Sequence, residues 1–418
     1  MYDVKRAFSL LEKISYERLG GSKEELQAAE TLKEVINSYG IEATIEEFPV
    51  DHSEVKVAKL TITSPIEKEI EATGVKMSGS TPIGGIEKEF VYVEDVMAAN
   101  VLDVEDKIVL INGRMMLKAY KKLIELKAAG FIAFSGSVDD DLNNSDLDIM
   151  SIREKMYENG KLPGVCIRAI EAENLVRLNP KTVKLELQQE ESKRNSRNVV
   201  CEIKGSKYPE QKIAITAHYD SVKFSSGAYD NATGSVGIME LFHHFAVNKP
   251  NRTLVFIWCG SEEMGLLGSK AYLETHQEEV NKFVFCLNVD MIGCVLGKEI
   301  AVCTAENALV SYIDYMAKEI GVALKSSQGV YSSDSTPFAD KGVPSVSFAR
   351  ISPRGGAEIH SRKDQLTHLS AEAFDSSLKV MLEFLSRLDS SIVFPVERVI
   401  PENMKLELDY YNQRKFRD

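Results

Sequence analysis

This chain of 418 residues lacks most features of secreted and membrane proteins. Its six cysteines form no CxxC pair, and most of them lie in apolar runs, which is typical of reduced, buried thiols. The first twenty residues lack the uninterrupted apolar core of a signal peptide. No run is long and apolar enough to span a membrane. We therefore expect a cytoplasmic protein with no membrane partner.

Basic residues are also in deficit, since 50 Lys and Arg stand against 63 Asp and Glu, for a formal net charge of −13. A general nucleic-acid binder needs a basic surface, so we expect no nucleic-acid partner. Internal repeats and low-complexity segments are lacking too. The 44% of hydrophobic residues is enough for a large core, and the length predicts two or three domains.

What the sequence does contain is an alternation of strand and helix patterns. The apolar, β-branched runs Ile213–Ala217 and Thr253–Trp258 are typical of buried parallel strands, and similar runs follow at Phe283–Val289 and Val343–Phe348. Helical patterns lie between them. This order predicts an α/β fold with a mostly parallel mixed sheet sandwiched by helices.

Two changes of pattern divide the chain. Short strand-like runs with Gly- and Ser-containing turns begin near Val55, and a basic, polar linker lies at Ser192–Arg197. We predict a catalytic domain of residues 1–54 and 192–391, an inserted, β-rich α+β domain of residues 55–191, and a C-terminal tail of residues 392–418. The tail either packs on its own body or reaches a second subunit, so a homo-oligomer stays an alternative.

Acidic and imidazole side chains follow the predicted buried strands. Any one of them alone is weak evidence, because a lone Asp at a strand end is usually a turn or cap residue. Their order matters more, because the carboxyl ends of parallel strands meet at one edge of a sheet. Two imidazoles and several carboxylates there are enough ligands for two metal ions. The residues are His218, Asp220, Asp230, Glu262, Glu263, Asp290 and His360.

The spacing of these residues suggests different roles. A metal-bound imidazole usually donates its other N–H to a carboxylate, so we assign His218 to the metal and Asp220 to the orientation of its ring. Adjacent side chains point different ways, so one of Glu262 and Glu263 can bind metal while the other stays free as a base. The small residues after Asp230 let a helix start close to the site. The mixed ligand set favours zinc, although cobalt or manganese would also fit.

Six motifs resemble the M28 family of zinc aminopeptidases: HYDS, AYDNATG, SEEMGLLGS, NVDMIG, SSDSTPF and HSRKD. The resemblance covers residues 1–48 and 197–388, and it implies the phosphorylase/hydrolase-like fold of zinc peptidases. The inserted domain is similar to a protease-associated domain, a non-catalytic module. The SSDSTPF motif, with Ser333 and Asp334, is expected to support the site structurally.

The resemblance also implies roles for single residues. Glu262 would be the general base that activates a metal-bridged water, and the peptide bond Asp230–Asn231 would be cis. Two zinc ions would be bound. The implied ligands are His218 and Asp290 for one zinc, Glu263 and His360 for the other, and Asp230 for both.

One position departs from the family pattern. Many members carry a tyrosine just before the last histidine ligand, where it donates to the oxyanion, but this chain has Ile359 there. The oxyanion must then be stabilised by zinc alone or by another donor. Candidates near the substrate are Tyr331, Arg350 and Arg354.

The sequence thus predicts a metalloexopeptidase, an aminopeptidase acting on peptides with a free N-terminus. One alternative is a carboxypeptidase-like enzyme in which Arg350 or Arg354 grips the substrate carboxylate. A second is a glutaminyl cyclase-like acyltransferase with one zinc, for which His218 and Glu263 would be surplus. A third is a binding protein that kept the fold without catalysis, although the retained ligands and base disfavour it.

Overall fold

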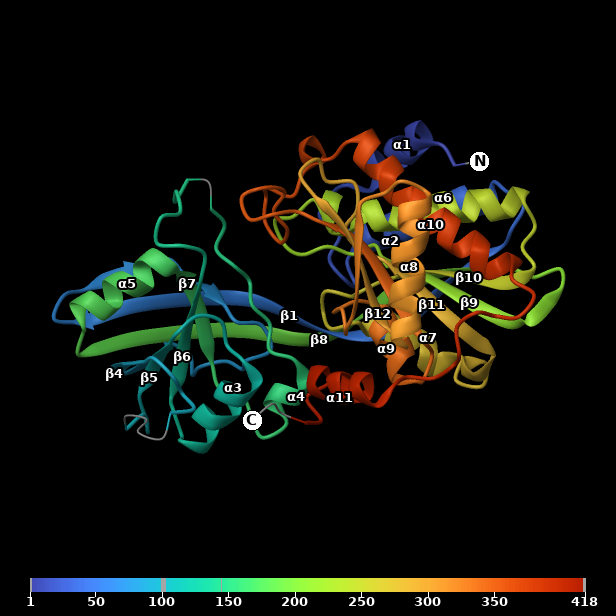
Figure 1. Cartoon of the computed structure of the whole chain (residues 1–418). Coiled ribbons are helices and arrows are strands. Elements are labelled where there is room, and N and C mark those ends of the chain that lie inside the picture. The colour runs from blue at the N-terminus through green and yellow to red at the C-terminus, as the bar shows by residue number, and fades with distance from the viewer. Residues whose placement is uncertain (1, 99–102, 144, 416–418) are drawn as a thin grey trace. The chain divides into compact units, whose positions relative to one another are not determined.

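The computed structural model describes residues 2–98, 103–143 and 145–415 (Figure 1). The chain forms two compact units, a larger unit of Met1–Val50 with Asn195–Asp418 and an inserted unit of Asp51–Arg194. These limits fall inside two long strands, β1 (Ala43–Ser64) and β8 (Thr182–Ile203), as do the predicted boundaries after residue 54 and before residue 192. Residue 1 and residues 416–418 of the predicted tail lie outside the described residues.

The prediction of a linker at Ser192–Arg197 was wrong, because these residues continue β8 without a break. The residues on either side of Ser192–Arg197 therefore belong to one strand. β8 pairs with β1. Strands pair through backbone hydrogen bonds, which need no apolar side chains. A polar stretch such as Ser192–Arg197 can therefore be a strand even though its side chains are typical of a loop.

The larger unit contains a mixed sheet with the strand order β13-β12-β14-β11-β9-β10-β8. β9 lies in the middle and is parallel to both β10 and β11, while β14 is parallel to β11 and β12 is parallel to β13. Only the β12–β14 and β10–β8 pairs are antiparallel among these neighbours. The predicted mostly parallel sheet is thus confirmed. The strands are β9 (Tyr208–His218), β10 (Arg252–Cys259), β11 (Phe283–Val289), β12 (Lys298–Thr304), β13 (Leu324–Gln328) and β14 (Ser345–Ile351).

Successive side chains of a strand point to opposite sides of the sheet. Because these strands have apolar side chains on both sides, helices cover both faces of the sheet. Ile213 and Ile215 of β9 belong to one core cluster, whereas Ala214 between them belongs to another. The first cluster includes side chains of α1 (Val4–Ile14), α2 (Lys23–Asn37), α6 (Thr233–Val247), α8 (Asn307–Glu319) and α10 (Ala371–Ser390). The second includes side chains of α7 (Leu267–Thr275) and α9 (Ser335–Asp340).

The inserted unit has its own sheet. Strands β4 to β7 are parallel neighbours in chain order, β3 is antiparallel to β7, and β4 is antiparallel to β8. Two core clusters lie on its faces. Its elements are β2 (Lys68–Ile70), β3 (Thr73–Gly74), β4 (Ile86–Val93), β5 (Ile108–Ile111), α3 (Leu117–Glu125), β6 (Gly130–Ser135), α4 (Glu154–Tyr157), β7 (Gly164–Arg168) and α5 (Ala169–Leu178).

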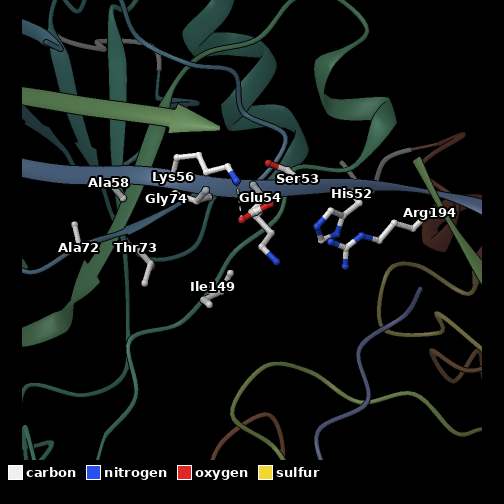
Figure 2. A pocket seen from close by; sticks show the side chains of 12 residues that line it. His52, Ser53, Glu54, Lys56, Ala58, Ala72, Thr73, Gly74, Ile149 and Arg194 are labelled. Carbon is white, nitrogen blue, oxygen red and sulfur yellow. Dashed lines mark ion pairs between the residues drawn. The ribbon is translucent and has the colours of Figure 1, made fainter. Parts of the chain in front are cut away.

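A pocket of about 500 Å³ opens in the inserted unit. Figure 2 shows His52 and Arg194 on one side of it and the Lys56–Glu54 ion pair beside them. None of the predicted site residues lines this pocket. It is therefore separate from the predicted catalytic chemistry.

The short elements that remain all belong to the larger unit. They are η1 (Ala228–Ala232), η2 (Val280–Lys282), η3 (Leu366–His368) and α11 (Glu402–Tyr411). All six cysteines are buried and unpaired, which confirms the predicted free thiols. Within the described ranges, no helix has both the length and the apolar character needed to cross a membrane.

Candidate metal centre

The five predicted metal ligands meet at the carboxyl ends of the central strands. They form two groups, each with one ligand atom per residue and all of its atoms within 4.8 Å of one another. One group holds His218, Asp230 and Asp290, and the other holds Asp230, Glu263 and His360. Asp230 belongs to both. The predicted convergence is thus found in the structure.

The carboxylate of Asp230 lies between the two imidazoles. Its Oδ1 lies 3.1 Å from Nε2 of His218, and its Oδ2 lies 3.1 Å from Nε2 of His360. Asp290 Oδ1 lies 3.5 Å from the first imidazole, and Glu263 Oε1 lies 3.1 Å from the second. One carboxylate therefore presents a different oxygen to each of the two groups of possible ligands.

Strand register explains why residues distant in sequence come together. β9 ends at His218, which is level with Cys259, the last residue of parallel β10. Glu262 and Glu263 follow β10 after a short turn, and Asp290 follows directly after β11 on the other side of β9. Parallel neighbours end at the same edge, so their next residues share one site.

A tight turn brings Asp230 to this edge. The Asn231 side chain donates from Nδ2 to the Val289 carbonyl (3.0 Å), and its Oδ1 accepts the N–H groups of Gly234 (2.9 Å) and Met291 (3.0 Å). A Cβ added at Gly234 would lie 2.4 Å from the Val289 oxygen, so α6 starts directly against the end of β11. The Asp230–Asn231 peptide bond is cis, as the family resemblance implies.

Asp220 lies behind the site and contacts three of its parts. Its Oδ1 accepts the Glu262 N–H (3.0 Å) and its Oδ2 accepts the Glu263 N–H (3.3 Å). The same Oδ1 lies 3.4 Å from Nδ1 of His218, which is long for a hydrogen bond, so their interaction at this distance is mainly electrostatic. Asp220 is thus next to the ring that it was expected to orient, and it also holds the Glu-Glu turn.

The electrostatics of the site favour a cation. Burial raises the pKa of Glu262 well above its usual value, and the negative charges of Asp334, Glu263 and Asp290 add to the rise. Burial likewise raises the pKa of Asp290. Burial would lower the pKa of His360, but Asp230 and Glu263 outweigh it and raise that pKa to about 11. Positive charge is therefore stabilised where the carboxylates crowd together.

The hydrogen-bond inventory agrees with metal binding. Asp290 Oδ1 and Glu263 Oε1 are buried and have no hydrogen-bond partner among the residues that the structure describes, although buried carboxylate oxygens are normally paired. Imidazole nitrogens and carboxylate oxygens are ligands that suit zinc. The residues present therefore fit divalent metal ions at both positions.

Two residues that the sequence analysis did not single out hold the loop of this site. Arg18 is completely buried, and its guanidinium donates to the carbonyls of Tyr219, Ser226 (2.6 Å) and Gly227 (2.8 Å). Burial lowers the pKa of Arg18 to about 10, still high enough to keep its charge at neutral pH. The second residue, Asp364, accepts the Asp230 N–H (3.1 Å).

The signals for these two residues differ. Asp364 ends the HSRKD motif, so the family resemblance already pointed toward it. Arg18 lies about 200 positions before its partners, and no local pattern marks it.

The predicted substrate-binding residues differ in their surroundings. Burial raises the pKa of Tyr331, and the negative charges of Asp290 and Asp230 raise it further, so its hydroxyl lies within their field. Arg350 donates to the Cys294 carbonyl (2.7 Å) and to Glu299 (3.1 Å), which ties its guanidinium to the protein. Arg354 is exposed in a loop. Contact of these three residues with substrate stays a prediction.

Comparison with known proteins identifies a family domain in this chain. Residues 198–385 match the model described as "Peptidase family M28", and they include His218, Asp230, Glu262–Glu263, Asp290 and His360. The chain is 28% identical over 395 residues to "Aminopeptidase YwaD" of Bacillus subtilis (strain 168), covering 89% of this chain and 82% of that protein. Residues 198–385 are therefore a peptidase family M28 domain.

A second relative has a different name, and a solved structure shares the fold. The chain is 25% identical over 410 residues to "Carboxypeptidase Q" of Bos taurus, covering 92% of this chain and 84% of the relative. The crystal structure of BSAP, a zinc aminopeptidase from Bacillus subtilis, superimposes with a TM-score of 0.78 at 22% identity, covering 96% of this chain and 99% of that one. That likeness confirms the fold, and the M28 domain makes this chain a metallopeptidase.

Proposed function

We propose that this M28 peptidase is an aminopeptidase that binds two zinc ions and removes residues from peptides with a free N-terminus. The observation that carries the proposal is the Asp230 carboxylate, whose two oxygens face two different imidazoles. The relative named as an aminopeptidase supports the choice of substrate end.

Each side chain then has a distinct task. His218 and Asp290 would hold one cation, Glu263 and His360 would hold the other, and Asp230 would contribute to both. Bound zinc supplies a Lewis acid that polarises the peptide carbonyl and makes water more acidic. Glu262 is the remaining carboxylate, and its oxygen lies 4.0 Å from Nε2 of His218. It accepts the proton of the attacking water and passes it to the leaving amine.

Tyr331 is the proposed donor to the oxyanion. Ile359 has no donor in its side chain, and the guanidinium of Arg350 is tied to Cys294 and Glu299. Because the pKa of Tyr331 is raised, its hydroxyl keeps its proton and remains a donor at neutral and mildly alkaline pH. The substrate ammonium group is held by the carboxylates of the centre, with Glu262 and Asp290 the nearest candidates.

Replacing Glu262 with Gln tests the base. The amide keeps the shape of the side chain but cannot accept a proton, so Glu262→Gln should lower kcat by about 10³-fold while the zinc content stays unchanged. Turnover of aminoacyl anilides and elemental analysis measure the two quantities. Glu278→Gln, at an exposed glutamate, should behave like wild type. A fully active Glu262→Gln enzyme would show that another group is the base.

A carboxypeptidase is the main alternative, because of the relative named Carboxypeptidase Q. Paired peptides separate the two activities. We expect hydrolysis of a peptide with a free amine and an amidated C-terminus, and none of the N-acetylated peptide with a free carboxylate. The reverse pattern would identify a carboxypeptidase, and Arg354→Ala would then be the variant to examine.

A glutaminyl cyclase-like enzyme is separated by metal stoichiometry. That alternative needs one zinc and leaves Glu263 and His218 without a purpose, and the presence of one of them in each group of possible ligands supports the aminopeptidase instead. Titration of metal-free protein should therefore end at two zinc ions per chain.

A further inference from the structure

The C-terminal helix α11 packs against α9 and the loop before it (Figure 1). The contact is apolar at its centre, and Leu408 is only 2% exposed. The cluster consists of Ile400, Met404, Leu408 and Ala339, with Val330 partly buried against them. Val330 directly precedes Tyr331, so the helix packs next to the proposed oxyanion donor.

Polar contacts secure the same loop along its length. Asn403 Nδ2 donates to Gln328 Oε1 (2.7 Å) at the start of the loop. The hydroxyls of Tyr411 and Ser332 are 2.7 Å apart in its middle. Arg414 pairs with Asp340 (3.0 Å) at the end of α9. The C-terminal segment therefore holds the outer side of residues 328–340 at three places.

The inner side of the loop is attached to elements of the metal centre. Ser333 Oγ lies 2.8 Å from Ser347 Oγ on β14, and Ser347 is level with Asn288 of β11, which leads to Asp290. Asp334 accepts a hydrogen bond from Ser269 (2.7 Å) on α7, the helix that follows the Glu262–Glu263 turn. Tyr331 thus lies in a loop held between α11 and the catalytic edge of the sheet.

We propose that α11 is a positioning element for catalysis, which holds residues 328–335 so that the Tyr331 hydroxyl meets the oxyanion. The inference rests on the proposed function, since α11 itself touches no reacting atom and acts through Tyr331. Residues 329–334 lie between β13 and α9 and belong to no helix or strand, so contacts on both sides contribute to the position of the loop. Displacements of about 1 Å are enough to reduce a catalytic rate by about 10²-fold.

Leu408→Asp is the main test, with Leu406→Asp as its matched control. The carboxylate introduced at position 408 would face the apolar contact, whereas Leu406 lies on the same helix but is 38% exposed. One oxyanion donor raises kcat by roughly 10²-fold. We expect Leu408→Asp to remove part of this gain and to lower kcat on aminoacyl anilides about 10-fold. Zinc content should not change, and amide exchange should quicken over residues 328–340. Leu406→Asp should match wild type in all three measurements.

A second background shows whether the effect passes through Tyr331. In Tyr331→Phe protein the hydroxyl is already missing. Adding Leu408→Asp should therefore lower kcat by less than about 2-fold, because the effects of residues that act as a unit do not add. Should Leu408→Asp fail to fold, Tyr411→Phe removes only the hydroxyl facing Ser332 and should lower kcat about 3-fold, again with no further loss beside Tyr331→Phe.

The outcomes separate this inference from the proposed function. Suppose that the wild type is active and that amide exchange over residues 328–340 is equally fast in Leu408→Asp and in wild type. That result overturns the positioning role alone. Equal losses of kcat with and without the Tyr331 hydroxyl also overturn it. A zinc-loaded wild type without aminopeptidase activity overturns the proposed function, and with it the catalytic role of α11.

Discussion

At the scale of single residues, Asp220 connects the two halves of the metal centre. It accepts the N–H groups of Glu262 and Glu263 and lies beside the His218 ring. Its negative charge therefore acts on the His218 imidazole of one ligand group and on the Glu262–Glu263 turn, which supplies a carboxylate to the other ligand group. Such outer carboxylates orient metal ligands and raise their basicity.

Replacing Asp220 with Asn should weaken zinc binding by about 10- to 100-fold, because the charge beside the imidazole is lost. Competition with a zinc chelator measures the affinity. Asp389→Asn is a matched control, since Asp389 is also buried and accepts the consecutive N–H groups of Asn251 and Arg252. That variant should lose stability without losing zinc. Equal zinc affinities in both variants would remove the special role of Asp220.

Sequence alone predicted the charged residues at the strand ends but not their supports. His218 and Asp290 stand out because several acidic and imidazole residues follow buried strands in one order, although any one of them alone is weak evidence. Asn231 carries no charge, and its three hydrogen bonds go to backbone groups of Val289, Met291 and Gly234. Contacts to backbone depend on the folded path of the chain, so side-chain identity gives little sign of them.

At the scale of elements, the start of α6 is the tightest part of the site. The turn η1 leads into α6, and the Thr233 hydroxyl accepts the Ile292 N–H (3.1 Å) just beyond Asp290. A Cβ at Gly234 would lie 2.3 Å from Asn231 Oδ1 and 2.4 Å from the Val289 oxygen, so there is no room for a side chain at this position. The position of Asp230 thus depends on how closely a helix approaches a strand end.

Gly234→Ala should destabilise the protein by about 2–3 kcal/mol, because the new methyl group would overlap backbone and force the helix away from β11. Gly237→Ala lies one turn later, where a Cβ would meet only the tip of the Ile292 side chain at 2.9 Å. That variant should be nearly neutral, since alanine favours a helix over glycine by about 1 kcal/mol. Denaturant unfolding compares them, and equal losses of stability would contradict the role of close approach.

The elements themselves were predicted where apolar periodicity is strong. The runs that became β9, β10 and β11 are buried on both faces and could be recognised from composition. Ser192–Arg197 could not, because its residues are polar and mostly exposed although they continue β8. Strand pairing there depends on the partner β1, about 140 positions earlier, and single-sequence patterns contain no trace of such a partner.

At the scale of the whole molecule, all five proposed metal ligands come from the larger unit, while the inserted unit has its own core clusters. Metal binding should therefore stabilise one unit only. At a free zinc concentration about 1,000-fold above its dissociation constant, the gain is about 4 kcal/mol. For a unit of this size that corresponds to roughly 8–16 °C in Tm.

Calorimetry with and without a chelator measures this difference. The transition of the larger unit should fall by that amount on zinc removal, and a separately produced fragment of residues 51–194 should melt at the same temperature with and without the chelator. A chelator-sensitive fragment, or an insensitive full chain, would contradict the assignment of the ligands to the larger unit.

The buried guanidinium of Arg18 also has a consequence for biosynthesis. During synthesis, Arg18 leaves the ribosome long before Tyr219, Ser226 and Gly227, whose carbonyls its guanidinium finally binds. Until then the nascent N-terminal segment must leave that positive charge hydrated. Completion of the metal pocket is consequently a late event, which follows the emergence of more than half of the polypeptide.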